Sequence, residues 1–219
     1  MTTPPASLPF RPARLIPLVV LPALLASSPA AHAVDGTITI NGEITDSTCK
    51  INGKMPPSNF IVNLPKISTS ALKTKGDTAG ATLFSIRLTE CPASLTGEVK
   101  AYFEPGVTTD YDSGALYAYT PVTGTDTSTA DSPLGSIPSR GSATKAADVE
   151  IQLANTDGTA IKIGAATNSA KGSTLVAGTG TDTKKSATLN YLARYYKSGT
   201  ATITAGKLVT YVQYSIVYP

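Results

Sequence analysis

The sequence is poor in the residue types from which most active sites and transition-metal centres are built. Its 219 residues include no tryptophan, one histidine and two cysteines, and only 15% are charged. Histidine is the commonest general base, and histidine and cysteine are common zinc ligands. Catalysis would therefore depend on carboxylates. The pairs Asp110 with Asp112 and Glu98 with Glu104 lie in turn-like and strand-like surroundings, which favour solvated surface groups. We expect no enzyme activity, no metal and no cofactor.

Long apolar runs are also absent, apart from one near the N-terminus. Arg11 and Arg14 precede the run LIPLVVLPALLA at 15–26, and a stretch of small residues follows it. About 12 apolar residues broken by two prolines are too short for a membrane helix of roughly 20 residues. The pattern is typical of a secretory signal peptide. We interpret residues 1–33 as this signal peptide and expect the mature chain to begin at Val34.

Without this segment the chain has almost no net charge. The segment contains two of the 18 basic residues and the only histidine, His32, which leaves 16 basic against 15 acidic residues. A balance near +1 gives no basic field for nucleic acid, so we expect no nucleic-acid partner. The remaining chain of about 186 residues suits one exported domain with a sizeable core.

The two cysteines, Cys49 and Cys91, are the only thiols. An even pair in an oxidising compartment indicates one disulfide. It would close a loop of about 42 residues, worth roughly 4 kcal/mol in the chain-entropy model. The alternative is two buried free thiols.

Short stretches that alternate between apolar and polar residues predict an all-β fold, because turn-forming residues separate them. A turn of helix is expected at 67–76. The Thr-, Ser- and Gly-rich stretches at 106–147 and 165–185 are interpreted as surface loops of one sandwich. The alternative, a linker between two domains, is less favoured because neither flank has enough strands to bury two sheet faces. The predicted strands are 36–44, 60–64, 82–88, 98–104, 148–154, 159–163, 186–196 and 210–219.

Both ends of the predicted mature chain have the pattern of an amphipathic strand. The faces that we expect to meet a core consist of Val34, Gly36, Ile38 and Ile40 at the N-terminus, and of Val212, Tyr214, Ile216 and Tyr218 at the C-terminus. Either the two strands pair within one molecule, or the N-terminal strand of one copy pairs with the C-terminal strand of the next. The pattern alone leaves both open. The second arrangement is head-to-tail, and head-to-tail contacts that do not close make filaments.

Several motifs resemble the pilin subunits of the chaperone–usher pathway. The signal peptide is followed by GTITINGEITDSTC, which ends at Cys49, by LPKIS at 64–68 and by GDTAGATLFSIRLTECP at 76–92. The family's C-terminal signature, a glycine fourteen residues from the end and a penultimate tyrosine, is matched by Gly206 and Tyr218. Within the family, the chain looks most like the major serotype fimbrial subunits of Bordetella. The resemblance covers essentially the whole predicted mature chain.

The resemblance implies an incomplete immunoglobulin-like sandwich that lacks its last strand. Residues 45–219 then form the pilin domain, with a groove beside the C-terminal strand. A periplasmic chaperone fills the groove first, and at the outer-membrane usher the extension 34–44 of the next copy replaces it as donor strand. Gly36 matches the family's glycine at the shallow point of the groove. The implied groove-edge residues are Gly206, Val212, Tyr214, Ile216 and Tyr218, and the implied donor residues are Val34, Gly36, Ile38 and Ile40.

The implied function is that of a major structural subunit in the shaft of a surface fimbria that supports adhesion to host surfaces. Its implied partners are other copies of itself, the chaperone, the usher and a tip adhesin, with host glycans as a further candidate. One departure from the family is that no residue precedes Val34 if cleavage follows Ala33, so the outermost groove contact depends on Val34 itself. The alternatives are a minor or tip-proximal pilin and a secreted monomeric carbohydrate-binding sandwich, in which Tyr102, Tyr117 or Tyr119 stacks on a sugar.

Overall fold

The computed structural model describes residues 38–44, 48–120, 144–166, 169–181 and 183–219. The predicted signal peptide, Val34 and Gly36 lie outside these ranges. The chain divides into two units, residues 1–43 and residues 44–219. Across the described ranges, no helix is long and apolar enough to span a membrane.

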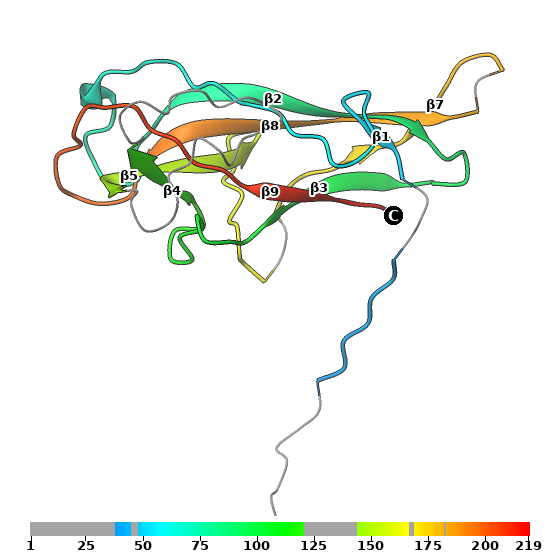
Figure 1. The fold of residues 1–219 in the computed structure, drawn as a ribbon, viewed down its shortest axis with the longest axis horizontal. Coiled ribbons are helices and arrows are strands. Elements are labelled where there is room, and N and C mark those ends of the chain that lie inside the picture. Colours follow the sequence, from blue (N-terminus) through cyan, green and yellow to red (C-terminus); the bar gives the residue numbers. More distant parts are fainter. Residues whose placement is uncertain (1–37, 45–47, 121–143, 167–168, 182) are drawn as a thin grey trace, which may run out of the picture. The chain divides into compact units, whose positions relative to one another are not determined.

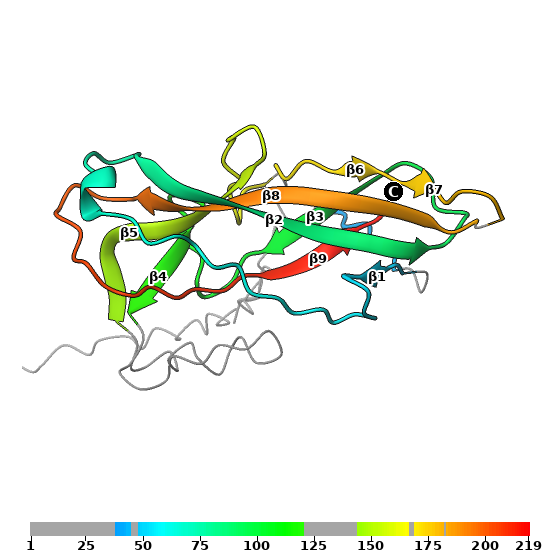
Figure 2. The ribbon, with the colours of Figure 1, turned by 90° about the horizontal axis from the view of Figure 1, so that it is seen from above.

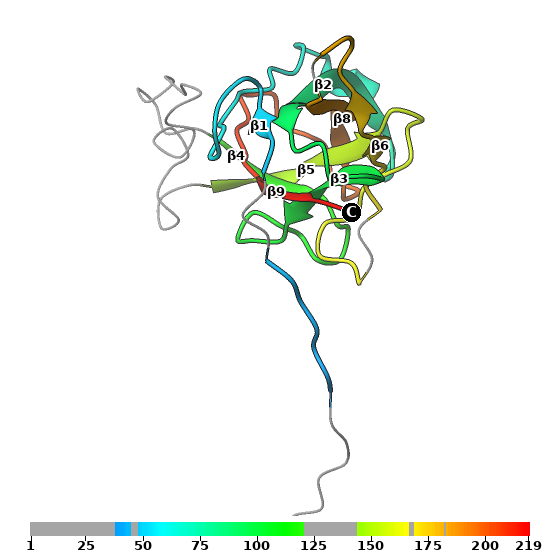
Figure 3. The ribbon, with the colours of Figure 1, turned by 90° about the vertical axis from the view of Figure 1, so that its right-hand side faces the viewer.

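Residues 44–219 form two antiparallel β-sheets and a single turn of helix in their described part. The elements are β1 (Lys50–Ile51), η1 (Thr69–Ala71), β2 (Thr78–Cys91), β3 (Glu98–Glu104), β4 (Leu116–Thr120), β5 (Thr144–Asn155), β6 (Ser173–Thr174), β7 (Val176–Ala177), β8 (Lys185–Lys197) and β9 (Gln213–Val217). The larger sheet has the order β1-β2-β8-β5-β4, with β7 paired to β8, and the smaller has the order β6-β3-β9. Figure 1 shows β2 and β8 in one layer and β3 and β9 in the other, and Figure 3 separates the same layers in a view turned by 90°. The all-β sandwich predicted from the sequence is confirmed.

The centre of the larger sheet is the pair β2 and β8, which run side by side in Figure 2. Ile86 lies opposite Leu189 and Leu88 lies opposite Ala187, and all four are buried. Arg87, between the two β2 positions, is exposed. Alternation at period two therefore puts one face of each long strand into the core.

The core between the sheets is rich in aromatic rings. The ring centroids of Phe103 and Tyr191 are 5.2 Å apart in an edge-to-face arrangement, and Phe84 lies 5.9 Å from Tyr191. Tyr191 is fully buried, yet its hydroxyl donates to the carbonyl of Lys171 at 2.8 Å and accepts from the backbone N–H of Ala101 at 3.2 Å. The ring is thus buried without an unpaired polar group.

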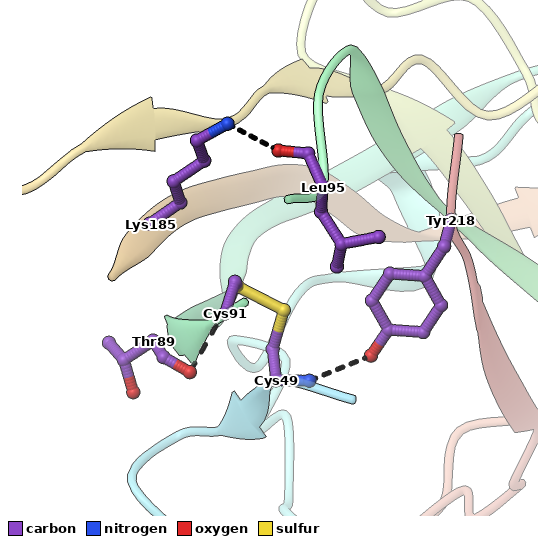
Figure 4. Close-up of a disulfide and its surroundings, with 6 residues drawn as sticks. All are labelled: Cys49, Thr89, Cys91, Leu95, Lys185 and Tyr218. Carbon is purple, nitrogen blue, oxygen red and sulfur yellow. Dashed lines mark hydrogen bonds between the residues drawn. A yellow bond between two sulfur atoms is a disulfide. The ribbon is translucent and has the colours of Figure 1, made fainter. Parts of the chain in front are cut away.

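The predicted disulfide between Cys49 and Cys91 is confirmed, with an S–S distance of 2.07 Å and both residues fully buried. Figure 4 shows its surroundings. The backbone N–H of Cys49 donates to the hydroxyl of Tyr218 at 3.2 Å, and Lys185 Nζ donates to the carbonyl of Leu95 at 2.6 Å. The disulfide therefore joins the first residues of the sandwich to the end of β2 at a point where the C-terminal chain is also attached.

The strand predictions are correct for the long alternating segments and wrong for others. Residues 98–104 coincide with β3, and 82–88, 148–154 and 186–196 lie within β2, β5 and β8. Residues 60–64 and 159–163 form no strand, apart from one bridge between Ala154 and Ala160. The described part of 36–44 is in no strand of the single chain, and its pairing with another copy stays a prediction. Alternation reports which side chains face a core, whereas a strand also needs a neighbour with which to pair.

The predicted turn of helix at 67–76 is confirmed by η1. The two predicted loops are wrong in part. The stretch 106–147 contains β4 and the start of β5, and 165–185 contains the short β6 and β7. The few strand residues in these stretches lie among Thr, Ser and Gly, so the composition of the stretches did not indicate the strands.

Candidate functional site

Within the described chain, the C-terminal segment pairs along one edge only. β9 is antiparallel to β3, with Tyr214 opposite Phe103. Upstream, Val209 exchanges two backbone hydrogen bonds of 2.9 Å with Tyr119, next to the end of β4. No described strand pairs with the other edge of β9. Such an edge presents backbone N–H and C=O groups to which another strand can pair.

The side chains of this segment alternate as the sequence predicts. Val212, Tyr214, Ile216 and Tyr218 are partly buried and pack against the core. Gln213, Ser215, Val217 and Pro219 are exposed. The strand itself is shorter than predicted, since Val212 and Tyr218 flank β9 rather than belong to it.

An apolar groove of about 350 Å³ opens beside the C-terminal segment. Its lining includes Phe103, Leu116 and Leu153, which belong to the buried core. Residues 60–64 line it on one side, and 208–212 line it on the other. Among the described residues, the lining contains no acidic or basic side chain. The groove therefore leads directly to the hydrophobic core and suits an apolar, uncharged face.

Residues 60–64 are connected to the C-terminal segment through side chains. The ring centroids of Phe60 and Tyr214 are 5.9 Å apart, edge to face, and the hydroxyl of Tyr214 donates to the carbonyl of Ser58 at 2.7 Å. No backbone–backbone hydrogen bond joins 60–64 to another part of the described chain. The main chain on this side is thus extended without a ladder, and its backbone groups are available to a further strand.

Thr210 in the groove lining is a residue that the sequence argument missed. Its Oγ1 is buried and has no hydrogen-bond partner among the described residues. The next residue, in contrast, has a hydrogen-bond partner: the backbone carbonyl of Tyr211 accepts from Thr108 Oγ1 at 2.7 Å. A buried hydroxyl without a partner costs about 1 to 3 kcal/mol. Threonine is common on either face of a strand, so the sequence pattern gave no signal for this group.

A second hollow, of about 770 Å³, shares Leu64, Tyr195 and Leu208 with the groove and continues it. Gly206 lines this hollow and lies outside β9. A Cβ added to Gly206 would meet only Thr120 Cγ2, at 3.9 Å. The single subunit therefore has space for a side chain at Gly206, and the role of this glycine at the groove edge stays a prediction.

The groove is electrically neutral at ordinary pH. Burial raises the pKa of Tyr214, and burial also raises the pKa of Tyr195. Tyrosine in water ionises near pH 10, so both hydroxyls stay protonated well above neutral pH. The electrostatics of the groove thus match its apolar lining.

The described part of the N-terminal unit is open to solvent. Residues 38–43 lie in no helix or strand. Ile38 and Ile40 are 88% and 89% exposed, and Ile44, the first residue of the second unit, is fully exposed. Leaving such a side chain in water costs about 1.5 to 3 kcal/mol relative to burying it. The other two predicted donor residues, Val34 and Gly36, lie outside the described residues.

Of the two acidic pairs considered from the sequence, the described structure separates one along a strand and holds the other in a local turn. Glu98 and Glu104 stand at opposite ends of β3, roughly 20 Å apart at about 3.3 Å per residue. Asp110 Oδ1 accepts from the backbone N–H of Asp112 at 3.0 Å, which is a local turn contact.

The three tyrosines proposed to stack on a sugar do not share one sheet. Tyr102 belongs to β3, whereas Tyr117 and Tyr119 belong to β4. Lys145 Nζ lies 3.4 Å from the centroid of the Tyr117 ring. The described structure therefore gives no common aromatic platform made from these residues.

The chain matches the family model "FimA: Type-1 fimbrial protein, A" over residues 64–219. It belongs to the family of type-1 fimbrial proteins, and the predicted resemblance to fimbrial subunits is confirmed. The Serotype 2 fimbrial subunit of Bordetella pertussis is 44% identical over 215 residues, which cover 97% of this chain and 99% of that protein. The Major fimbrial subunit SMF-1 of Stenotrophomonas maltophilia is 39% identical over 200 residues, which cover 89% of this chain and 99% of that protein.

One similar solved structure is that of the P pilus rod subunit PapA. It is 17% identical in sequence, with a TM-score of 0.45, and the match covers 79% of this chain and all of that chain.

Proposed function

We propose that this protein is a structural subunit of a fimbrial shaft and that it polymerises by donor-strand exchange. Residues 34–44 of one copy form the strand that fills the groove of the next copy. The observation that carries the proposal is the apolar groove, which reaches the core beside the open edge of β9. Membership of the type-1 fimbrial family and similarity to named fimbrial subunits support a shaft role.

The apolar surfaces of the two parts complement each other. The groove lining is uncharged and largely apolar, and Ile38 and Ile40 stand in solvent in the described extension. Burying these two side chains is worth about 3 to 6 kcal/mol before ordering costs. Val34 adds to this on the same strand face, and Gly36 leaves that face without a side chain at the shallow point.

The backbones of the two parts also complement each other. An inserted strand forms a ladder with the open edge of β9 on one side and with the extended residues 60–64 on the other. Strand addition of this kind gains affinity from main-chain hydrogen bonds and register from alternate side chains. The inserted strand also brings polar groups to Thr210, whose hydroxyl has no partner among the described residues. The partners of this reaction are thus other copies of the chain.

Before assembly the same groove needs a substitute strand, because its lining belongs to the core. A periplasmic chaperone supplies that strand, and its edge contacts are the half-buried Val212, Tyr214, Ile216 and Tyr218. The outer-membrane usher then exchanges it for the next subunit, and a tip adhesin occupies the distal end. The predicted signal peptide at 1–33 and the disulfide suit this exported route.

The test compares two strand faces of the extension. In the double variant Ile38→Asn/Ile40→Asn the apolar face is lost, whereas Thr39→Asn changes the opposite face of the same strand. Fimbriae sheared from cells are run unboiled and boiled on a denaturing gel. We expect the wild type and Thr39→Asn to give a ladder that collapses only on boiling, and the double variant to give monomer.

A variant lacking residues 34–44 provides the limiting case and is expected to give monomer only. A normal ladder from the double variant, or equal loss of the ladder in Thr39→Asn, contradicts insertion of this face. A single monomer band from the wild type contradicts strand exchange altogether.

A further inference from the structure

The sequence contains the dipeptide Asn-Gly twice, as Asn41-Gly42 and as Asn52-Gly53. In both places the preceding residue is isoleucine and the asparagine is exposed. Asn-Gly is the sequence in which an asparagine side chain is most easily attacked by the next backbone nitrogen, because glycine places no side chain in the way. The two Asn-Gly sites therefore differ in conformation rather than in local sequence or exposure.

Asn52-Gly53 is held in a tight turn. Asn52 has φ of 51° and Gly53 has φ of 78°, the combination expected of a type I′ hairpin turn. The backbone N–H of Asn52 donates to the carbonyl of Arg87 at 2.8 Å. Asn52 Oδ1 accepts from the backbone N–H of Arg87 at 2.9 Å. The side-chain amide is thus fixed on β2 by its oxygen, which hinders the rotation that would bring Cγ to the nitrogen of Gly53.

Asn41-Gly42 has none of these restraints among the described residues. It lies in no helix or strand, and its φ angles are not in the left-handed region. A Cβ added to Gly42 would meet nothing within 4 Å. The backbone can therefore rotate until the nitrogen of Gly42 reaches Cγ of Asn41.

We propose that Asn41 is a site of spontaneous deamidation in the subunit before assembly. The deprotonated backbone nitrogen of Gly42 attacks Cγ of Asn41, the Cγ–Nδ2 bond breaks, and ammonia leaves with a proton from water. The five-membered succinimide that results is opened by water at either carbonyl. One product is aspartate, and the other is isoaspartate, in which the main chain runs through the former side chain. This series of reaction steps needs water alone and involves no oxidation or reduction.

The modification changes the extension in two ways. Each product adds a negative charge two residues before Glu43. Isoaspartate also lengthens the main chain by one carbon between Asn41 and Gly42, so residues on its two sides no longer keep a common strand register. In subunits that remain unassembled, the modified extension can therefore no longer form a regular strand.

We also expect deamidation of Asn41 to be suppressed in the fibre, and this part of the inference rests on the proposed function. A strand paired on both edges holds its backbone extended and prevents the rotation that cyclisation needs. Asn41 is then protected in the fibre, in the same way that local structure protects Asn52 in every folded state.

The experiment measures both asparagines in one chain. The soluble chaperone-bound subunit, the same subunit unfolded in denaturant, and sheared fimbriae are incubated at mildly alkaline pH. Peptide mapping by mass spectrometry then follows amide loss, and isoaspartyl methyltransferase labelling identifies isoaspartate. In the soluble protein we expect Asn41 to react at nearly its unfolded rate and Asn52 to react at least about tenfold more slowly than when unfolded.

Two variants complete the test. Gly42→Ala, which the open surroundings tolerate, is expected to slow the reaction of Asn41 without changing that of Asn52. Asn41→Gln is expected to abolish the isoaspartate signal of that peptide. Equal protection of Asn41 and Asn52 in the soluble protein, or no effect of Gly42→Ala, overturns the proposed site. Fast reaction of Asn41 in intact fimbriae leaves the site standing and instead contradicts insertion of the extension as a paired strand.

Discussion

Removing the Tyr214 hydroxyl tests how the two sides of the groove are held together. In Tyr214→Phe the ring remains next to Phe60, but the carbonyl of Ser58 loses the 2.7 Å hydrogen bond. Ser58 is 5% exposed, so little water can replace the lost donor. Leaving a buried acceptor unpaired costs about 1 to 3 kcal/mol. Tyr214→Ala also removes the ring, and we expect a loss of about 3 to 5 kcal/mol.

The assay is urea unfolding of the soluble chaperone-bound subunit, followed by far-ultraviolet circular dichroism with the chaperone alone as the baseline. The order of midpoints should be wild type, Tyr214→Phe and Tyr214→Ala, at similar slopes. Tyr111→Phe is the matched control, because Tyr111 is 66% exposed, and we expect a change within about 0.5 kcal/mol. If Tyr214→Phe unfolds with the wild type, or if Tyr111→Phe loses as much, the two sides of the groove are not held by this hydrogen bond.

Three further predictions address other parts of the molecule. Burial raises the pKa of Glu150, so its protonated form contributes stability that is complete below about pH 4.5 and is lost as pH rises through the raised value. In Glu150→Gln, the midpoint of urea unfolding should fall less steeply as the pH rises across the acid range. An unchanged dependence of the midpoint on pH refutes this prediction. Cys49→Ser/Cys91→Ser opens a loop of 42 residues and should cost about 4 kcal/mol, whereas an unfolding midpoint equal to that of the oxidised wild type contradicts this. Gly36→Leu should block ladder formation on unboiled gels without unfolding the chaperone-bound subunit, and normal fibres from it rule out a shallow point at this residue.

Period-two alternation predicted the parts of the fold whose ladders are complete within one chain. Residues 98–104 give β3 with the same bounds, because Val99, Ala101 and Phe103 all enter the core. The same pattern at 60–64 gives no strand, since nothing in the described chain pairs with it. The mismatch is itself informative, because an extended, half-buried segment without a ladder is what one side of a groove requires.

Other features of the site had no readable signal in the sequence. Thr210 is polar at a position where the pattern predicts only an extended backbone, and its isolation depends on what surrounds Oγ1. The sequence pattern did not predict β4, because the strand lies in a stretch whose composition favours loops. Leu116 and Ala118 of β4 are nevertheless buried. The hydroxyl contacts of Tyr214 and Tyr218 span 156 and 169 residues of sequence, a separation at which local patterns carry no information.

The position of the disulfide has a mechanical consequence. In a fibre built as proposed, tension enters each subunit through the residues just before Cys49. The cross-link passes that load directly to the end of β2, and the bond from the backbone of Cys49 to Tyr218 shares it with the C-terminal segment. Residues 50–90 are thereby shielded from the pull. About 140 Å of chain cannot be drawn out while the bond is intact, so a stretched fibre keeps its subunits short.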